Sequence, residues 1–412
     1  MLVDHLVVDR AYGGRFQPKK GWAYVVDNKA ALKAWDALED KFPDQKEHKP
    51  YLLETAAAAN PTCLQCKTQD HILKWKFLGD KSPDAKWDRT SNPPEFVKDL
   101  SSPMNCFFCH DPHAAKPRIV RDGLIQALTR PEKDTLYHQD PNATKIDVKD
   151  FRSGFRKIAL LEKYYTKLQC GQCHVEYNCN PGYKPDDGSK IGTDDQRTNH
   201  FPLKDVFQIY EHYKTLGFKD FKHAITGGLL WKAQHPEAET FWNSVHDKAG
   251  ASCQSCHMPK MKNKQGKTFT SHWQTSPRAY LKETCGSCHK DRTEADFLYE
   301  IDSIRSHIKG KMRKAEFWLS NLIDKIVEAK KNGLPEQVIK DAQDQHAKAH
   351  ILWEWWTAEN SDGFHNPDMA KRSLIQSIDE SKKGINLVTK ALEEKAGGGN
   401  PASASAKPEE RK

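Results

Sequence analysis

The sequence predicts a mainly α-helical chain, with a compact core assembled around bound groups and long antiparallel helices toward the C-terminus. Three observations support this fold class. Apolar residues make up 37% of the 412 residues, below the roughly 45–50% of ordinary globular domains. Pairs of cysteines with the spacing Cys-x-x-Cys recur between residues 63 and 288. Beyond residue 295, apolar residues repeat with a helical period over long, charged stretches.

Four of the cysteine pairs are followed directly by histidine, at residues 106–110, 170–174, 253–257 and 285–289. In Cys-x-x-Cys-His, two thiols form thioether bonds with the vinyl groups of a haem, and the adjacent imidazole ligates the iron. Zinc and redox sites share the Cys-x-x-Cys part, but they explain a series of four complete motifs poorly. The sequence therefore predicts a multihaem c-type cytochrome whose core is partly porphyrin.

The first cysteine pair differs, because Cys63-Leu64-Gln65-Cys66-Lys67 has lysine where histidine is expected. A neutral amine is a good σ-donor, and its usual pKa of about 10.4 must be offset by coordination to iron. We expect Lys67 to ligate one face of the iron and to leave the other face open to a substrate. The alternative is that Lys67 has no role as a ligand, and that some other residue ligates the iron of this haem. The predicted attachment cysteines are Cys63, Cys66, Cys106, Cys109, Cys170, Cys173, Cys253, Cys256, Cys285 and Cys288.

The net charge and the remaining cysteine narrow the classes of function. The formal charge of +8 does not indicate nucleic-acid binding, because the propionates of five haems would absorb most of it and no aromatic-interleaved basic patch is present. Ten cysteines belong to the five pairs, and Cys179 is expected to be a free, partly buried thiol.

Covalent haem attachment takes place outside the cytoplasm, so we expect an exported protein in the periplasm or at the extracytoplasmic face. The first residues lack the basic flank and apolar run of a signal peptide, which suggests a processed form. No run of about 18 apolar residues is present, so no transmembrane segment is expected in this chain. A separate protein would then deliver electrons.

We assign residues 1–294 to a haem-packed core domain, in which local patterns predict few regular elements. Residues 1–62 are expected to be loops with one short helix near 28–39, and a polar loop at 82–94 separates the first two motifs. Short helices and turns are expected over 111–169. An amphipathic helix is expected over 205–216, and Pro236 is expected to start another in its first turn.

Residues 295–396 are predicted to form long antiparallel helices that follow the core domain. The first should span 295–331, because Asn332-Gly333-Leu334-Pro335 stops and restarts the pattern. The second should end near residue 360, and a break at 363–367 should precede the third. Apolar side chains at Trp318, Leu322, Trp353 and Trp356 predict a homodimer interface here, the alternative being a simple supporting bundle. The tail at 397–412 is expected to be disordered.

Several motifs together resemble the pentahaem ammonia-forming cytochrome c nitrite reductases. These are Cys-x-x-Cys-Lys, then Cys-Gly-Gln-Cys-His-Val-Glu-Tyr at 170–177, then Lys-Ala-Gln-His-Pro-Glu at 232–237. Residues 253–259, 359–361 and 363–367 match as well. The resemblance covers nearly the whole chain after about residue 20, in the same order.

The resemblance implies roles for individual residues. Lys67 would be the proximal ligand of the catalytic haem, and Tyr177 and His235 would hydrogen-bond nitrite and its reduction products. A calcium ion would take side-chain oxygens from Glu176 and Gln234, and backbone carbonyls from Tyr177 and Lys232. All four are hard oxygen donors, as calcium prefers. The remaining proximal haem ligands would be His110, His174, His257 and His289, in the order of the second to the fifth haem. The distal ligands would be His272 for the second haem, His365 for the fourth and His246 for the fifth.

The chain departs from the family pattern at two positions. Trp22 stands where the family has a distal histidine for the third haem, and His5, His48 or His113 could substitute. Lys33 takes the place of the pocket arginine. Lysine keeps the positive charge but loses the planar fork that grips an oxyanion.

The resemblance implies six-electron reduction of nitrite to ammonia at the Lys67 haem, with four bis-histidine haems relaying electrons. A membrane-bound quinol-oxidising cytochrome or a soluble cytochrome would be the donor. One alternative is a related enzyme that acts on hydroxylamine, nitric oxide or sulfite. The other is an electron-transfer cytochrome without catalytic activity. The departures from the family pattern at Trp22 and Lys33 are the reason to consider it.

Overall fold

The computed structural model describes residues 7–9, 56–58, 65–75, 86–87, 100–178, 182–192 and 194–397. Several predictions fall outside these ranges, including the helix near 28–39, most of the loop at 82–94 and the tail after residue 397. Trp22, Lys33, Cys63 and Cys179 also lie outside the described ranges, so their predicted roles stay predictions.

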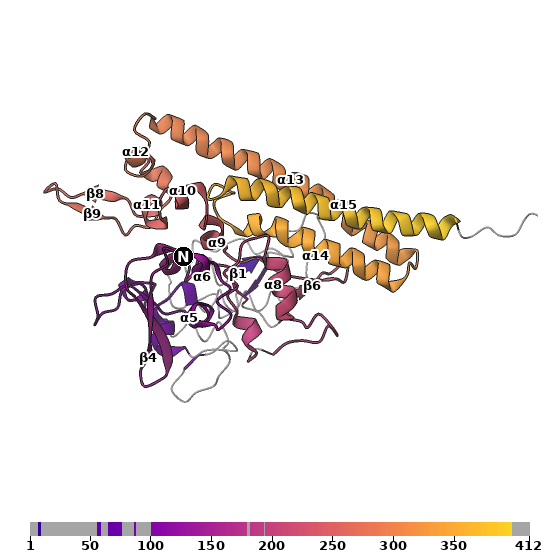
Figure 1. The fold of residues 1–412 in the computed structure, drawn as a ribbon, viewed down its shortest axis with the longest axis horizontal. Helices are drawn as coiled ribbons and strands as arrows, with labels where there is room; N and C mark the ends of the chain where they lie inside the picture. Colours follow the sequence, from indigo (N-terminus) through magenta and orange to yellow (C-terminus); the bar gives the residue numbers. More distant parts are fainter. Residues whose placement is uncertain are drawn as a thin grey trace, which may run out of the picture.

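Short elements build the chain up to residue 288, and three long helices follow them (Figure 1). The short helices are α3 (Asp70–Lys74), α5 (Asp122–Thr129), α6 (Leu136–Gln139), α7 (Thr166–Cys170), α8 (Ile209–Leu216), α9 (Glu237–Phe241), α10 (Val245–Lys248), α11 (Cys253–His257) and α12 (Cys285–Cys288). The 3₁₀ helices are η3 (Cys106–Phe108), η4 (Gln196–Asn199) and η5 (Pro277–Ala279). The strands are β1 (Val7–Asp9), β2 (Ala56–Ala58), β3 (Arg118–Ile119), β4 (Ile146–Phe151), β5 (Arg156–Leu161), β6 (Phe221–Lys222), β7 (Leu229–Leu230), β8 (Lys260–Lys262) and β9 (Thr268–Thr270).

An antiparallel sheet of order β3-β5-β4 occupies part of the segment that was expected to contain only short helices and turns. That expectation was wrong for 146–161, although α5, α6 and α7 are short helices. Strand β5 alternates buried and exposed side chains at its start, as a half-buried strand does. The turn from β4 to β5 places Arg152, Ser153 and Gly154 at positive φ, which folds the two strands back on each other as a tight hairpin.

Two predicted helices in the middle of the chain are confirmed with shifted boundaries. Helix α8 begins at Ile209 rather than at residue 205, because the Asp205 carboxylate accepts the backbone N–H groups of Phe207 and Gln208 in a turn that precedes the helix. It ends at Gly217, whose left-handed conformation closes the last turn. Pro236 directly precedes α9, as predicted.

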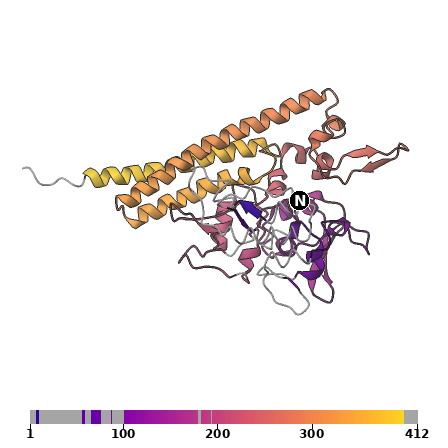
Figure 2. The ribbon, with the colours of Figure 1, turned by 180° about the vertical axis from the view of Figure 1, so that it is seen from behind.

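The three long helices, α13 (Glu294–Lys331), α14 (Glu336–Ala358) and α15 (Pro367–Gly397), confirm the prediction for the C-terminal region. They pack on one another and run along one side of the short elements (Figures 1 and 2). Thr293 and Asp296 cap α13 reciprocally. Gly333, at a φ of 58°, turns the chain into α14. Within the described ranges, none of the helices is long and apolar enough to cross a membrane.

The side chains that were predicted to form an apolar outer surface on these helices mostly lie inside the chain. Leu322, Trp353 and Trp356 are buried, and Trp318 is partly buried beneath the ammonium group of Lys382. The expectation of an exposed apolar surface was wrong for these residues. A helical period shows which residues share a face of a helix, but it does not show what covers that face. The tryptophans of α14 instead pack against α8, β6 and β7 in one core.

Candidate functional site

Lys67 is held in place by hydrogen bonds between its own segment and residues 101–104. Its backbone carbonyl accepts the N–H of Met104, at 3.2 Å. Asp70, at the start of α3, accepts the backbone N–H groups of Ser101 and Ser102 at 2.8 and 2.9 Å. Burial alone would raise the pKa of Asp70, but these bonds and others outweigh it and lower the pKa to about 2. The carboxylate therefore stays charged and fixes the position of the segment that carries Lys67.

Cysteines of different motifs adjoin each other. A hydrogen bond with Cys173 lowers the pKa of the buried Cys66 thiol, and one with Cys170 lowers the pKa of Cys253. The third motif therefore lies between the first and the fourth. The sequence spacing gave no indication of this order.

The structure brings together three pairs of histidines that the resemblance paired as iron ligands. The ring centres of His110 and His272 are 6.2 Å apart, and those of His257 and His365 are also 6.2 Å apart. His289 is close enough to His246 to contribute, after burial, to lowering its pKa. The pairs join residues that are distant in the sequence.

Hydrogen bonds orient several of these rings. The Nδ1 atoms of His272 and His257 lie 3.1 and 3.0 Å from the backbone carbonyls of Thr270 and Thr275, and Nδ1 of His365 lies 2.6 Å from the carboxylate of Glu359. A proton held on Nδ1 leaves Nε2 as the free electron-pair donor.

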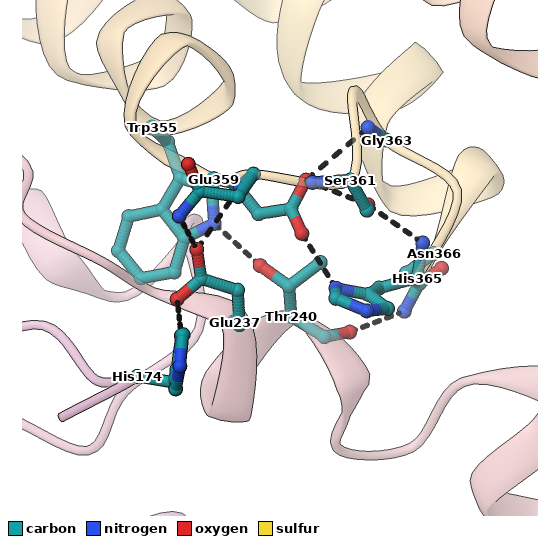
Figure 3. A network of polar contacts seen from close by, with 10 residues as sticks. His174, Glu237, Thr240, Trp355, Glu359, Ser361, Gly363, His365 and Asn366 are labelled. Carbon is teal, nitrogen blue, oxygen red and sulfur yellow. Dashed lines mark hydrogen bonds and ion pairs between the residues drawn. The ribbon is translucent and has the colours of Figure 1, made fainter. Parts of the chain in front are cut away.

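A network of polar contacts joins α9 to the loop after α14 (Figure 3). Glu237 contacts Nδ1 of His174 at 3.2 Å and accepts the backbone N–H of Asn360 at 3.0 Å. The indole of Trp355 donates to the Thr240 hydroxyl at 2.9 Å. Glu359 accepts N–H groups of its own loop, which shapes the turn that carries His365. The network thus ties two predicted iron ligands, His174 and His365, to one scaffold.

Tyr177 and His235, the predicted pocket residues, come from different segments near Lys67. The ring of Tyr177 is buried and stacks on Phe201 at 5.4 Å between centres. Crowding by protein atoms lowers the pKa of His235 to about 4, although its ring stays partly open to solvent, and Lys67 is one of the cations that add to this shift. Lys67 and His235 are therefore neighbours.

Glu176 lies in a buried region rich in carboxylate oxygens. One of its oxygens accepts the hydroxyl of Tyr213 and the other the backbone N–H of Gln234, both at 2.6 Å. Burial raises its pKa to about 8. Asp220, which accepts the backbone N–H of Lys232 at 2.9 Å, is also fully enclosed, and burial raises its pKa to about 6.

Within the described ranges, no group of three or more histidine, cysteine, aspartate or glutamate side chains forms a closed metal site. The predicted calcium ligands include a single carboxylate, that of Glu176, so they would not form such a group. Each of Asp220 and Glu239 has a carboxylate oxygen without a hydrogen-bond partner in the described part of the chain. Carboxylate oxygens are thus available in this region.

Sequence reasoning missed two residues of this region. Glu237 closes the network around His174, and its place next to the Lys-Ala-Gln-His-Pro pattern was an available signal. Arg121 lies beside Tyr177 and Cys66, and no local pattern marks it. Of the proposed substitutes for Trp22, His113 is exposed and forms neither a ring contact nor a hydrogen bond with His174, while His5 and His48 lie outside the described ranges.

Comparisons with known proteins place the chain in a family. The family model described as cytochrome c552 matches residues 19–411. A cytochrome c-552 of Bacteroides thetaiotaomicron is 29% identical over 357 residues, which cover 82% of this chain and 62% of that protein. The cytochrome c nitrite reductase subunit NrfA of Nitratidesulfovibrio vulgaris is 29% identical over 360 residues, covering 81% of this chain and 60% of that one.

A solved structure shares the fold. The catalytic subunit NrfA of the cytochrome c nitrite reductase from Desulfovibrio desulfuricans, described with two calcium sites, aligns with a TM-score of 0.60 at 26% identity. The alignment covers 82% of this chain and 68% of that subunit. The chain spans less than two thirds of the length of the two relatives named above.

Proposed function

Because the chain belongs to the cytochrome c552 family, we propose that it is a multihaem reductase that converts nitrite to ammonia at a haem ligated by Lys67. The observation that carries this proposal is the contrast among the motifs. One motif has lysine near His235 and Tyr177, whereas three other motifs have a second imidazole nearby.

The residues present fit covalently bound haem c. Two imidazoles on opposite faces of one metal ion, with bonds of about 2.0 Å, have ring centres about 6 Å apart. The pairs His110–His272 and His257–His365 match this spacing at 6.2 Å. The described motif cysteines are free thiols, so each of them can form a thioether bond with a haem vinyl group. When bound, five haems would relay the six electrons that the external donor supplies, and one of them would provide an open coordination position.

Around the open position, the side chains of this chain would handle the substrate and its protons. Reducing nitrite to ammonia takes nitrogen from +3 to −3 and consumes protons as each N–O bond breaks. Tyr177 and His235 would hydrogen-bond the substrate oxygens and pass protons to them. Lys33 would add positive charge against the oxyanion. Keeping these donors in fixed positions favours complete reduction over the release of intermediates.

The proposal includes a calcium ion near Glu176. Its predicted ligands are the side chains of Glu176 and Gln234 and the carbonyls of Tyr177 and Lys232. Buried carboxylates are costly without a compensating cation, and the unpartnered oxygens of Asp220 and Glu239 mark such a deficit. Metal analysis of protein prepared without chelator tests this point, and protein without calcium would contradict it.

A homodimer and a periplasmic location complete the proposal. Although Leu322, Trp353 and Trp356 are internal, Phe317 on α13 and Ile375 on α15 have exposed side chains. These apolar groups support an interface between two copies of the long helices. A membrane-bound quinol-oxidising cytochrome or a soluble cytochrome would be the electron donor. A monomer in light scattering at micromolar concentration would contradict the dimer.

Turnover separates this function from its alternatives. Protein with its full haem content is mixed with dithionite-reduced dye, and dye oxidation and ammonia are measured after nitrite, hydroxylamine, nitric oxide or sulfite is added. We expect nitrite-dependent oxidation with stoichiometric ammonia. Activity with another substrate alone would favour the related-enzyme alternative. Absence of both turnover and a nitrite-induced spectral change would indicate an electron-transfer cytochrome.

A further inference from the structure

We propose that Arg121 is the fixed positive charge of the candidate pocket, which holds Tyr177 in position and makes the pocket select anions. The inference deepens the proposed function and rests on it for the identity of the substrate. Arg121 directly precedes α5, and its contacts come from segments that lie far apart in the sequence.

The guanidinium group packs with two aromatic rings and a cysteine sulfur. Its central carbon lies 5.2 Å from the ring centre of Tyr177 and 5.3 Å from that of Phe201. These rings are stacked 5.4 Å apart with an interplanar angle of 18°. A cation at this distance from an aromatic ring is attracted to it. The three groups therefore pack as a trio that restricts where the Tyr177 hydroxyl can point.

The third contact of the guanidinium, with the cysteine sulfur, places this trio at the attachment motif that contains Lys67. Nη1 of Arg121 lies 2.7 Å from Sγ of Cys66, the residue before Lys67. Cys66 is the predicted point of attachment of the Lys67 haem, so the guanidinium would lie beside that haem. Arg121 thus contacts both a predicted attachment cysteine and the predicted substrate-binding side chain of Tyr177.

Within the part of the chain that the structure describes, Arg121 also differs from the other buried arginines in lacking a carboxylate partner. It is 1% exposed, Nη2 has no hydrogen-bond partner, and no carboxylate of the described residues lies within ion-pair distance. Three other buried arginines each have one, in the pairs Arg118–Asp111, Arg156–Asp122 and Arg130–Asp134. Burying an unpaired charge is costly. The free-energy cost of burying this charge is explained if the guanidinium binds an anion.

The same features determine which ligands should respond to Arg121. A guanidinium stays charged throughout the accessible pH range and presents a planar fork to an oxyanion. A small anion that enters beside the Lys67 haem gains from this charge, whereas a neutral ligand of similar size does not. The ratio of anion affinity to neutral-ligand affinity therefore reports on Arg121 separately from its packing.

The test compares ligand affinities of the oxidised, haem-loaded protein. The parent, Arg121→Met, Arg121→Lys and the control Arg130→Met are titrated with azide, an anion, and with nitric oxide, which is neutral, by absorption spectroscopy. We expect Arg121→Met to raise the Kd for azide at least tenfold and to change the Kd for nitric oxide less than threefold. Arg121→Lys should keep most of the azide affinity. Arg130→Met, which removes another buried guanidinium, should leave the ratio unchanged.

Equal changes for both ligands in Arg121→Met, an unchanged azide affinity, or a parent that does not bind azide would overturn the proposal. If Arg121→Met does not incorporate haem, Arg121→Gln removes the charge with less loss of polarity and decides the question. Ammonia production from nitrite is measured on the same samples. A parent without turnover, but with azide affinity that depends on Arg121, would refute the nitrite reductase and leave Arg121 as the anion-selecting charge.

Discussion

The motif at Lys67 and the motifs at His110 and His257 share one cysteine spacing but differ in what surrounds them. His110 and His257 each face a second imidazole, with ring centres 6.2 Å apart. Lys67 has no such partner predicted, and its neighbourhood contains Tyr177, His235 and Arg121, which has no carboxylate partner among the described residues. Hydrogen-bond donors and positive charge therefore gather at one motif, while the iron at each paired motif would be closed by two ligands.

This difference shows how one repeated motif can serve two purposes. Two imidazoles on one iron leave no coordination position for a substrate, so such haems are suited to passing electrons. An amine on one face, with a protein pocket on the other, suits bond chemistry. Under the proposed function, the attachment motif would decide where a haem is bound, and residues from elsewhere in the chain would decide what that haem does.

Replacing Lys67 is expected to have the largest effect, because it removes the residue that distinguishes the first motif from the others. Lys67→His should make the first motif like the other four and lower nitrite turnover at least about a hundredfold, or about 2.7 kcal/mol in activation free energy. Steady-state assays with reduced dye measure this change. Lys340→His, which alters an exposed lysine on α14, is the control. Parental turnover in Lys67→His would mean that the first haem is not special.

Weakening the orientation of one histidine in a histidine pair should lower turnover less and should also change different measured quantities. Glu359→Gln weakens the contact that orients His365, and outer-shell changes of this kind cost about 10–100-fold in metal affinity or activity. We expect roughly a tenfold loss of turnover, a shifted potential for one haem, and an unchanged Kd for nitrite. Redox titration and nitrite binding measure these quantities, with Asp368→Asn as the exposed control. A changed nitrite affinity would show that the two kinds of site are not separate.

The scaffold shared by His174 and His365 should respond in stability and not in chemistry. Thr240→Val keeps the side-chain shape but leaves the buried Trp355 indole N–H without its acceptor. The expected loss is about 1–2 kcal/mol in the free energy of unfolding, measured by denaturant titration of haem-loaded protein. Thr357→Val, which removes a hydroxyl bonded within α14, should cost less. Equal losses of unfolding free energy in the two variants would contradict a stabilising role for the hydrogen bond between Trp355 and Thr240.

The smallest effect concerns the anchor of α7, the helix that leads into the third motif. Lys167 bridges Asp140 and Asp247 at 2.7 and 2.9 Å. Burial opposes the shift, but hydrogen bonds from Lys167 and Tyr165 lower the pKa of Asp140 to about 2. Because the folded-state pKa lies below the usual value of about 3.9, the stabilisation is present above pH 4 and is lost as the pH falls toward 2.

Asp140→Asn should therefore lower the free energy of unfolding by about 1 kcal/mol at pH 7 after allowance for solvent screening. The difference from the parent should shrink below pH 4. Denaturant titrations at pH 7 and pH 3 measure both values. A difference that stays constant with pH would show that the charge of Asp140 is not what stabilises α7.

The parts of the structure that the sequence predicted are those with local causes. Helices α13 to α15 follow from a helical period bounded by stop signals such as Gly333. The third strand of the β3-β5-β4 sheet could not be predicted, because β3 has only two residues and its Arg118 pairs with the distant Leu160 of β5. Arg121 was missed for the same reason, since its contact with Cys66 spans 55 positions. The direction that Trp353 and Trp356 face could not be predicted, because it depends on what α8 and β7 cover.

The most direct test of the central claim is a nitrite titration of oxidised, haem-loaded protein followed by electron paramagnetic resonance. The account predicts that nitrite perturbs the signal of a single high-spin haem in the parent and leaves the low-spin, bis-histidine signals unchanged. In Lys67→His, that perturbation should be lost or its midpoint should rise at least tenfold. A perturbation of the same size and midpoint in Lys67→His, or one that falls on a low-spin haem in the parent, would contradict the account.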